Sequence, residues 1–140
     1  MNILKPFYVL LVSIILCCVM FSMTEAQFLQ QGSKLVGTGA TPSAFQGISV
    51  SLSADGNTAI VGGHYDNAGA GAAWVFTRSG GIWTQQGNKL VGTGAVGNAY
   101  QGSSVSISSD GNTAIVGGYN DSSNAGAAWV FTRSGGLWTQ

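Results

Sequence analysis

Charged side chains are scarce in this chain of 140 residues. Five Lys or Arg residues balance five Asp or Glu residues, so the formal net charge is zero. Without a basic stripe, long-range attraction to nucleic acid or to an anionic membrane surface has no source. We therefore expect no nucleic-acid partner. Histidine occurs once and no glutamate follows Glu25, so side chains suited to acid–base chemistry are few.

Long hydrophobic runs are also missing after the N-terminus. The one such run, residues 9–23, follows a single basic residue, Lys5, and precedes small residues. This order is typical of a secretory signal peptide, so we predict a signal over 1–26 and a secreted or extracellular protein. The alternative is an uncleaved anchor helix. A membrane span needs about 20 apolar residues, whereas this run has 15, so we expect no span after cleavage.

Cysteine is confined to the same segment. Cys17 and Cys18 both lie in the predicted signal. The mature chain, 27–140, therefore has no disulfide, thiolate nucleophile or cysteine metal site, and its stability must come from packing.

Helix signals are absent, because no apolar stripe recurs every 3.6 residues and 22 glycines interrupt the chain. The chain has a tandem repeat instead. Residues 31–85 are followed without a gap by residues 86–140, which are identical at 41 of 55 positions. A repeat of this length indicates an array of one supersecondary module, so we expect a single repeat domain over 27–140.

Each unit contains four short extended segments separated by turn signals. In the first unit we expect strands at 49–53, 58–63, 72–78 and 82–85. Asp-Gly and Gly-Gly pairs mark tight turns between the first two and the last two of these segments. A variable loop separates the second and third.

The third strand is apolar on both sides. Trp74 and Phe76 face one way, and Ala73 and Val75 face the other. A sheet with a wet face alternates apolar with polar residues, so this strand belongs to a sheet covered on both faces. The pattern predicts an all-β fold of four-stranded antiparallel β-propeller blades. A solenoid is the alternative, but its coils usually repeat at shorter periods.

The stretch Gly47–Gly63, GISVSLSADGNTAIVGG, followed by GAAWVF at 71–76, resembles an FG-GAP repeat, the blade of integrin-α-type β-propellers. The second unit repeats the pattern at 102–118 and 126–131. One departure is the spacing Phe-Gln-Gly at 45–47, where the family name implies adjacent Phe and Gly. The resemblance implies a propeller fold in an extracellular setting, with adhesion or ligand recognition as the expected activity.

Some integrin-type blades bind Ca²⁺ in the loop between their first two strands, where oxygen ligands occupy alternate positions. In this chain the corresponding stretch, 51–56, keeps only the last acidic position, Asp55, and the copy keeps only Asp110. We therefore expect both aspartates to be turn residues, with no metal site and no cofactor.

Candidate binding residues come from the loops in which the two units differ most. They are His64, Tyr65, Asp66, Tyr119, Asn120 and Asp121. Loops on a rigid scaffold commonly carry recognition. The alternative for Asp66 and Asp121 is a turn-capping role, and for His64 a place on the loop rim. Asn120 also begins an N-glycosylation sequon, Asn-Asp-Ser, which applies if the source is eukaryotic.

The tryptophans allow two interpretations. A large side chain within an apolar strand most simply fills the space between blades, but tryptophan also stacks on sugar rings. Arg78 and Arg133, at strand ends, are expected to pair with an Asp or to lie over an aromatic ring. The four tryptophans are Trp74, Trp83, Trp129 and Trp138.

Together these features predict a secreted, non-enzymatic propeller repeat protein that binds an extracellular protein partner or serves adhesion. The alternative is an oligomeric, carbohydrate-binding module that recognises a glycan. No nucleophile, base and orienting group can be assembled, so we expect no catalytic residues. Closed propellers have about four to eight blades, and this chain encodes about two. Truncation of a longer array is favoured, because residue 140 falls within the fourth strand, and closure of a ring by a homo-oligomer is the other explanation.

Overall fold

The computed structural model describes residues 28–140. The chain divides into two units, 1–30 and 31–140. Of the first unit only residues 28–30 are described, and they lie outside any helix or strand. The predicted signal peptide, 1–26, lies outside the described residues. Within residues 28–140, no helix is long and apolar enough to cross a bilayer.

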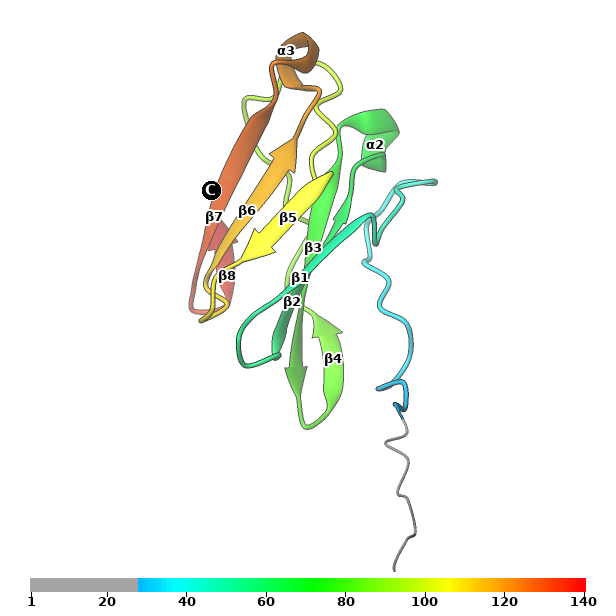
Figure 1. The fold of residues 1–140 in the computed structure, drawn as a ribbon, viewed down its shortest axis with the longest axis vertical. Coiled ribbons are helices and arrows are strands. Elements are labelled where there is room, and N and C mark those ends of the chain that lie inside the picture. The colour runs from blue at the N-terminus through cyan, green and yellow to red at the C-terminus, as the bar shows by residue number, and fades with distance from the viewer. Residues whose placement is uncertain (1–27) are drawn as a thin grey trace, which may run out of the picture. The chain divides into compact units, whose positions relative to one another are not determined.

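The first sheet has four antiparallel strands in sequence order (Figure 1). They are β1 (Ser49–Leu52), β2 (Thr58–Gly63), β3 (Ala72–Ser79) and β4 (Ile82–Gln85). β1 pairs with β2, β2 with β3 and β3 with β4, which is an up-and-down meander. The prediction of a four-stranded antiparallel sheet is therefore confirmed.

The second sheet repeats the first at an offset of 55 residues. Its strands are β5 (Ser104–Ile107), β6 (Thr113–Gly118), β7 (Ala127–Ser134) and β8 (Leu137–Thr139). The register is also repeated, because Val61 of β2 lies opposite Trp74 just as Val116 of β6 lies opposite Trp129. The two repeats thus fold in the same way.

Two four-residue segments, α2 (Asp66–Gly69) and α3 (Asp121–Asn124), lie between the second and third strands of each sheet. Asn67 and Ala68 inside α2 have positive φ values of 49° and 55°, and the equivalent residues of α3 are also left-handed. These segments are tight turns rather than amphipathic helices. The sequence therefore lacks the apolar pattern with a 3.6-residue period by which a helix is predicted. Both lie at the same end of the two sheets (Figure 1).

The two faces of β3 are buried separately, as predicted. Trp74 and Phe76 belong to one buried cluster. Ala73 and Val75 belong to a second cluster, which also contains Trp129 of the other sheet. β3 is therefore covered on both sides, which explains why its sequence is apolar at successive positions.

The second cluster forms the core between the two sheets. It joins Ile60 of β2 to Val116 of β6, with Leu90 from the linking segment at its margin. Strands β1 and β5 lie beside each other (Figure 1). The backbone N–H of Ala54 donates to the carbonyl of Ser109 at 3.1 Å across the junction. The sheets are thus two open antiparallel layers stacked face to face, as propeller blades are.

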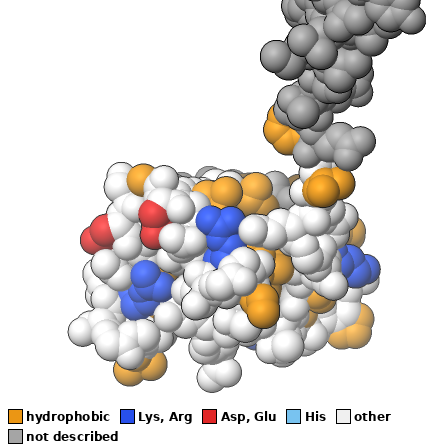
Figure 2. Space-filling view, turned by 90° about the horizontal axis from the view of Figure 1, so that it is seen from below, with side chains coloured by type: hydrophobic (Ala, Val, Ile, Leu, Met, Phe, Trp, Pro, Cys, Tyr) orange, Lys and Arg blue, Asp and Glu red, His pale blue; other side chains and the backbone are white. Residues whose placement is uncertain are grey.

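The β1–β2 and β3–β4 turns lie at the end of the sheets opposite α2 and α3. Figure 2 shows this end, where acidic and basic side chains are mixed with uncharged ones. Neither acidic nor basic side chains form a large patch of a single charge on this face, in keeping with the zero net charge of the sequence.

Candidate functional site

Five aromatic rings meet at the end of the sheets that carries α2 and α3. We call this set the aromatic platform: Phe45, His64, Tyr65, Tyr100 and Tyr119. Phe45 stacks on His64 with ring centroids 5.8 Å apart, and Tyr65 stacks on Tyr100 at 5.9 Å. Tyr100 reaches Tyr119 at 5.3 Å, so the ring contacts run without a break from the first repeat to the second.

The strands and the loops before them place these rings. His64 and Tyr65 directly follow β2, and Tyr119 directly follows β6. Phe45 and Tyr100 come from the irregular segments that precede β1 and β5. Because the two sheets are stacked in the same orientation, the ends of β2 and β6 bring equivalent loops side by side.

The platform is open to solvent. Phe45, Tyr65 and Tyr119 are exposed, and His64 and Tyr100 are half-buried. His64 Nδ1 is buried and has no hydrogen-bond partner among residues 28–140. Large exposed apolar patches are uncommon on monomers, which makes the platform a candidate interaction surface.

The backbone beneath two of the rings is strained. Phe45 and Tyr100 have φ values of 54° and 55°, in the left-handed region that bulky residues avoid. Such a conformation costs on the order of 1–3 kcal/mol and persists only when the surroundings enforce it. The Tyr100 N–H donates to the carbonyl of Gly69 at 2.9 Å, and the next residue, Gln101, is buried and bonded to Gly92. These bonds fix the backbone of the second repeat at Tyr100.

A hollow of about 420 Å³ lies in the same loop region, lined by Val96, Gly97, Asn98, Asn120 and Ser123. The Asn120 side-chain amide donates to the carbonyl of Asn98 at 2.6 Å, which fixes its orientation. Asn120 follows Tyr119 directly, so amide groups and an exposed ring are available together. The glycosylation of Asn120 stays a prediction.

Asp66 and Asp121 are turned into the protein. Asp66 is buried, forms an ion pair with Lys89 and accepts a hydrogen bond from the Thr41 backbone at 2.7 Å. Asp121 is also buried and accepts from the Val96 backbone at 2.7 Å. Both carboxylates tie loops together and are buried, so they do not belong to the exposed aromatic platform. The structure therefore brings His64, Tyr65 and Tyr119 together but directs the two aspartates elsewhere.

The turn aspartates have structural partners. Asp55 Oδ1 accepts hydrogen bonds from the Ser53 hydroxyl at 2.6 Å and from the Asn57 backbone at 2.9 Å. These bonds, the one from Ser53 first, lower the pKa of Asp55 to about 2. The pKa of Asp110 is lowered in the same way by the Ser108 hydroxyl and then by Asn112. Residues 28–140 contain no group of three or more His, Cys, Asp or Glu side chains that could hold a metal ion.

The tryptophans are engaged in packing. Trp74 is buried, and its indole N–H donates to the carbonyl of Thr38 at 2.8 Å. Trp129 is buried with the equivalent bond to Thr93. Their faces are not accessible for stacking on a sugar. Trp83 and Trp138 are half-buried, and each lies beneath an arginine, with the guanidinium carbon of Arg78 or Arg133 5.4 Å from the ring.

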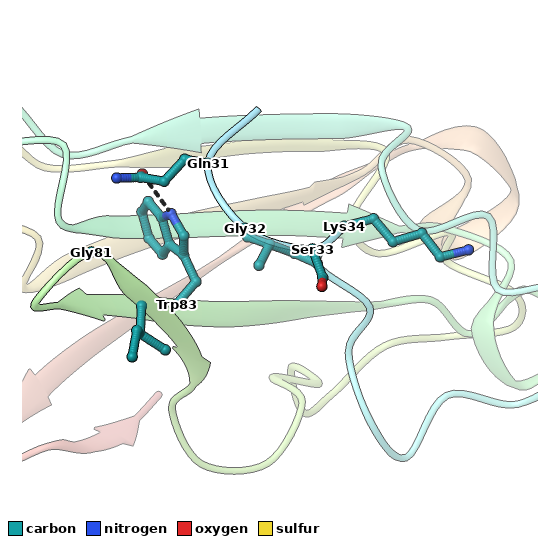
Figure 3. Close-up of a pocket in the computed structure, with 8 residues that line it drawn as sticks. Gln31, Gly32, Ser33, Lys34, Gly81 and Trp83 are labelled. Carbon is teal, nitrogen blue, oxygen red and sulfur yellow. Dashed lines mark hydrogen bonds between the residues drawn. The ribbon is translucent and has the colours of Figure 1, made fainter. Parts of the chain in front are cut away.

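A shallow groove of about 250 Å³ runs between the segment Gln31–Leu35 and the β3–β4 hairpin (Figure 3). Gln31 Oε1 accepts from the guanidinium of Arg78 at 2.9 Å and from the Trp83 indole at 3.3 Å. The same arrangement recurs around Gln86. Its principal polar groups bond one another, so this groove is a packing feature of each repeat.

The structure adds Phe45 and Tyr100 to the residues that the sequence indicates. Each occupies the same repeat position before Gln-Gly, and this repeated aromatic was the available signal. Chemically, the platform offers ring faces for stacking and phenolic hydroxyls for hydrogen bonding. Its one imidazole, that of His64, contacts the rings of Phe45, Tyr65 and Tyr100.

Residues 83–131 match the sequence model of the FG-GAP repeat family. The matched stretch extends from β4 to β7 and includes Tyr100 and Tyr119 of the platform. The resemblance noted from the sequence is therefore confirmed, and the fold is that of a β-propeller-type repeat protein. Repeats of this family are typically extracellular and generally non-enzymatic. A search of curated proteins finds no significant match.

Proposed function

We propose that this FG-GAP repeat chain is a secreted, non-enzymatic protein that binds an extracellular partner, in an adhesive role, through the aromatic platform. The family setting and the predicted signal over 1–26 support secretion. The observation that carries the proposal is the unbroken series of ring contacts from Phe45 to Tyr119 on an exposed surface.

The energetics of aromatic side chains favour such a role. A buried Tyr or Phe removes about 150–250 Å² of surface from water, and tyrosine is enriched among the residues that dominate binding energy. The platform rings also pack on one another, so less side-chain freedom is lost when a partner covers them. The strained backbone at Phe45 and Tyr100 supports the same role, because both left-handed residues contribute a ring to the platform.

The distribution of differences between the repeats supports the same surface. Of 14 differing positions, nine lie in 41–45 and 64–69 or in the equivalent residues of the second repeat. The loops of these segments surround the platform, whereas β2 and β3 are repeated without change in β6 and β7. Divergent loops on an unchanged scaffold are the usual arrangement of a recognition surface.

A second candidate function is glycan binding, because exposed rings lie beside a hollow lined by amide and hydroxyl groups. Sugar rings stack on aromatic faces, and Asn98, Asn120 and Ser123 offer hydrogen bonds to sugar hydroxyls. In this version the stacking groups are Tyr119 and Tyr100, since Trp74 and Trp129 are buried.

The test uses the mature protein recovered from expression of the full chain. It is applied to an array of extracellular-matrix proteins and to a glycan array, alongside Tyr65→Ala, Tyr119→Ala and the double variant. We expect at least a tenfold loss of binding for the double variant, because tyrosine is enriched among the interface residues whose truncation costs about 2 kcal/mol or more. The control is Ile82→Ala, an exposed apolar residue in β4.

Loss of a matrix-protein signal supports adhesion, and loss of a glycan signal supports the second candidate. Binding that survives in the double variant contradicts both, and an equal loss with Ile82→Ala shows that the loss is not specific to the platform. Near-ultraviolet circular dichroism of each variant shows whether the sheets are intact.

A further inference from the structure

Equivalent residues of the two repeats differ sharply in exposure on one face. Ile60 of β2 is 0% exposed, whereas its counterpart Ile115 of β6 is 44% exposed. Val75 of β3 is 1% exposed, whereas Val130 of β7 is 49% exposed. In the first repeat this face is covered by the second sheet. In the second repeat the same side chains lie uncovered.

The opposite face shows the reverse pattern. Val50 of β1 is 68% exposed, whereas its counterpart Val105 is half-buried and packs on the core between the sheets. Leu52 is 59% exposed, whereas its counterpart Ile107 is 9% exposed. Val50, Leu52 and Leu35 line an almost wholly apolar hollow of about 340 Å³. The chain thus carries both halves of its own internal interface, one on each outer side.

We propose that copies of this chain associate head to tail by repeating that interface. The leading face of one copy, formed by Lys34, Leu35, Val50 and Leu52, docks on the trailing face of another. The trailing face is formed by Ile115, Asp121, Ala128 and Val130. The occupant of each face is therefore a second copy of the same chain.

Charge supports this arrangement. Within the chain, Lys89 of the second repeat pairs with buried Asp66 of the first. The counterpart of Asp66 is Asp121, which is also buried but has no cationic partner among residues 28–140. The counterpart of Lys89 is Lys34, which is exposed. Docking in the internal register brings Lys34 of one copy to Asp121 of the next.

Backbone groups are matched as well. Ala73 of β3 exchanges two hydrogen bonds with Leu90, of 3.0 and 2.7 Å, on its side away from β2. Ala128 occupies the same position in β7, opposite Gly117 of β6. Among residues 28–140, no backbone group bonds to the N–H and carbonyl of Ala128 on the side away from β6. Leu35 is the counterpart of Leu90. A second copy supplies Leu35 at this edge, which is the addition of an extended segment to an unpaired strand.

A glycine marks the same contact. A Cβ on Gly62 would lie 2.1 Å from the carbonyl oxygen of Gly102, in the segment that precedes β5 of the second repeat. For a Cβ on the counterpart, Gly117, the three nearest atoms all belong to Ser104 of its own sheet. In the proposed assembly the carbonyl of Gly47 from the second copy takes the place of Gly102. Assembly then places a backbone carbonyl, which cannot rotate away, where a side chain at Gly117 would lie.

The interface is heterologous, because it joins two different faces, so copies form a closed ring or an open filament. Closed propellers contain about four to eight blades. With two sheets in each chain, closure corresponds to two, three or four copies.

The first test is the solution mass of the mature protein by light scattering over a concentration series. We expect a discrete species of two to four copies. A monomer throughout the series overturns the proposal, and so does an aggregate of undefined mass whose size is unchanged by the face variants below.

The second test separates the two faces. Ile115→Asp/Val130→Asp removes the trailing face and Val50→Asp/Leu52→Asp removes the leading face, so each variant should be monomeric. An equimolar mixture should give a dimer with one copy of each, because one intact leading face meets one intact trailing face. Failure of the mixture to associate, or association of either variant alone, overturns the proposal.

Controls address folding and position. Leu137→Asp is the control for position. Leu137 is an exposed apolar residue, and its counterpart in the first repeat, Ile82, stays exposed although the second sheet packs on that repeat, so this substitution should leave the solution mass of the assembly unchanged. Gly117→Ala adds only one methyl group and should leave the monomer folded while weakening assembly at least tenfold. Assembly of Gly117→Ala at the affinity of the unaltered protein counts against the proposed register.

Discussion

Lys89 pairs with Asp66 across the junction between the two repeats, and Asp66 is buried almost completely. The same carboxylate also receives the Thr41 N–H, so one side chain of the first repeat anchors a loop and the start of the second repeat. This ion pair connects the sheets at the end that carries the aromatic platform.

We predict that Lys89→Met destabilises the fold by about 3 kcal/mol, because it leaves a buried carboxylate without its counter-charge. The measurement is the free energy of unfolding in urea. Lys34→Met is the matched control, and its effect should be below about 0.5 kcal/mol because Lys34 is exposed. Both are made in the Ile115→Asp/Val130→Asp background so that association does not contribute. Equal effects at the two positions contradict the role of the pair.

Stability should fall in acid through the turn aspartates. The folded pKa of Asp55 is about 2, below its ordinary value of 3.8, and the pKa of Asp110 is also lowered. A depressed carboxyl pKa contributes stability that is complete above pH about 4 and is lost as the pH falls toward 2. Asp55→Asn/Asp110→Asn should flatten this part of the curve. Unfolding midpoints measured from pH 2 to pH 6 test this, and an unchanged slope argues against it.

Gly62→Ala should destabilise the protein by about 3 kcal/mol, at the upper end of the range for overpacking. The added methyl group meets the backbone carbonyl of Gly102, which cannot rotate away. Gly117→Ala is the matched control, because there the nearest atom is the Ser104 hydroxyl, which can. We expect a cost of about 1 kcal/mol or less in the monomeric background. Urea unfolding of the pair measures the difference, and similar costs show that the close approach of the sheets does not restrict Gly62.

Phe45→Gly should be more stable than Phe45→Ala by about 0.5–1 kcal/mol. Both variants remove the exposed ring, but alanine retains the left-handed strain at φ 54° and glycine does not. The greater freedom of glycine in the unfolded chain offsets part of this gain. Thermal and urea unfolding compare the two variants directly. A more stable alanine variant indicates that the conformation at this position is relaxed.

The sheets could be predicted from the sequence because their signals are local. The continuous apolar run around Trp74 and the Asp-Gly turn at Asp55 each determine structure within a few residues, and the repeat applies the same signals to both units. The separation of Trp74 and Phe76 from Ala73 and Val75 follows from the period of a strand, and the structure confirms it.

The platform could be predicted only in part. His64, Tyr65 and Tyr119 were expected in loops, but their contact with Tyr100 depends on how the two sheets stack. Phe45 lies in an irregular segment with positive φ, where no periodic pattern indicates the direction of a side chain. The burial of Asp66 could not be predicted either, because its partner, Lys89, belongs to the other repeat and meets it only when the two sheets stack.

The identity of the repeated strands has a consequence for how the chain reaches its native topology. β2 and β6 share the sequence TAIVGG, and β3 and β7 share AAWVFTRS, so pairing β2 with β7 reproduces every native cross-strand neighbour. The two pairings differ in the length of the connecting loop. The native β2–β3 hairpin closes a loop of residues 64–71, whereas the non-native β2–β7 pairing closes a loop of residues 64–126. An eightfold longer loop costs only about 2 kcal/mol in closure entropy. Kinetic traps with exchanged hairpins, within one molecule or between two, are therefore an inherent hazard of refolding this protein.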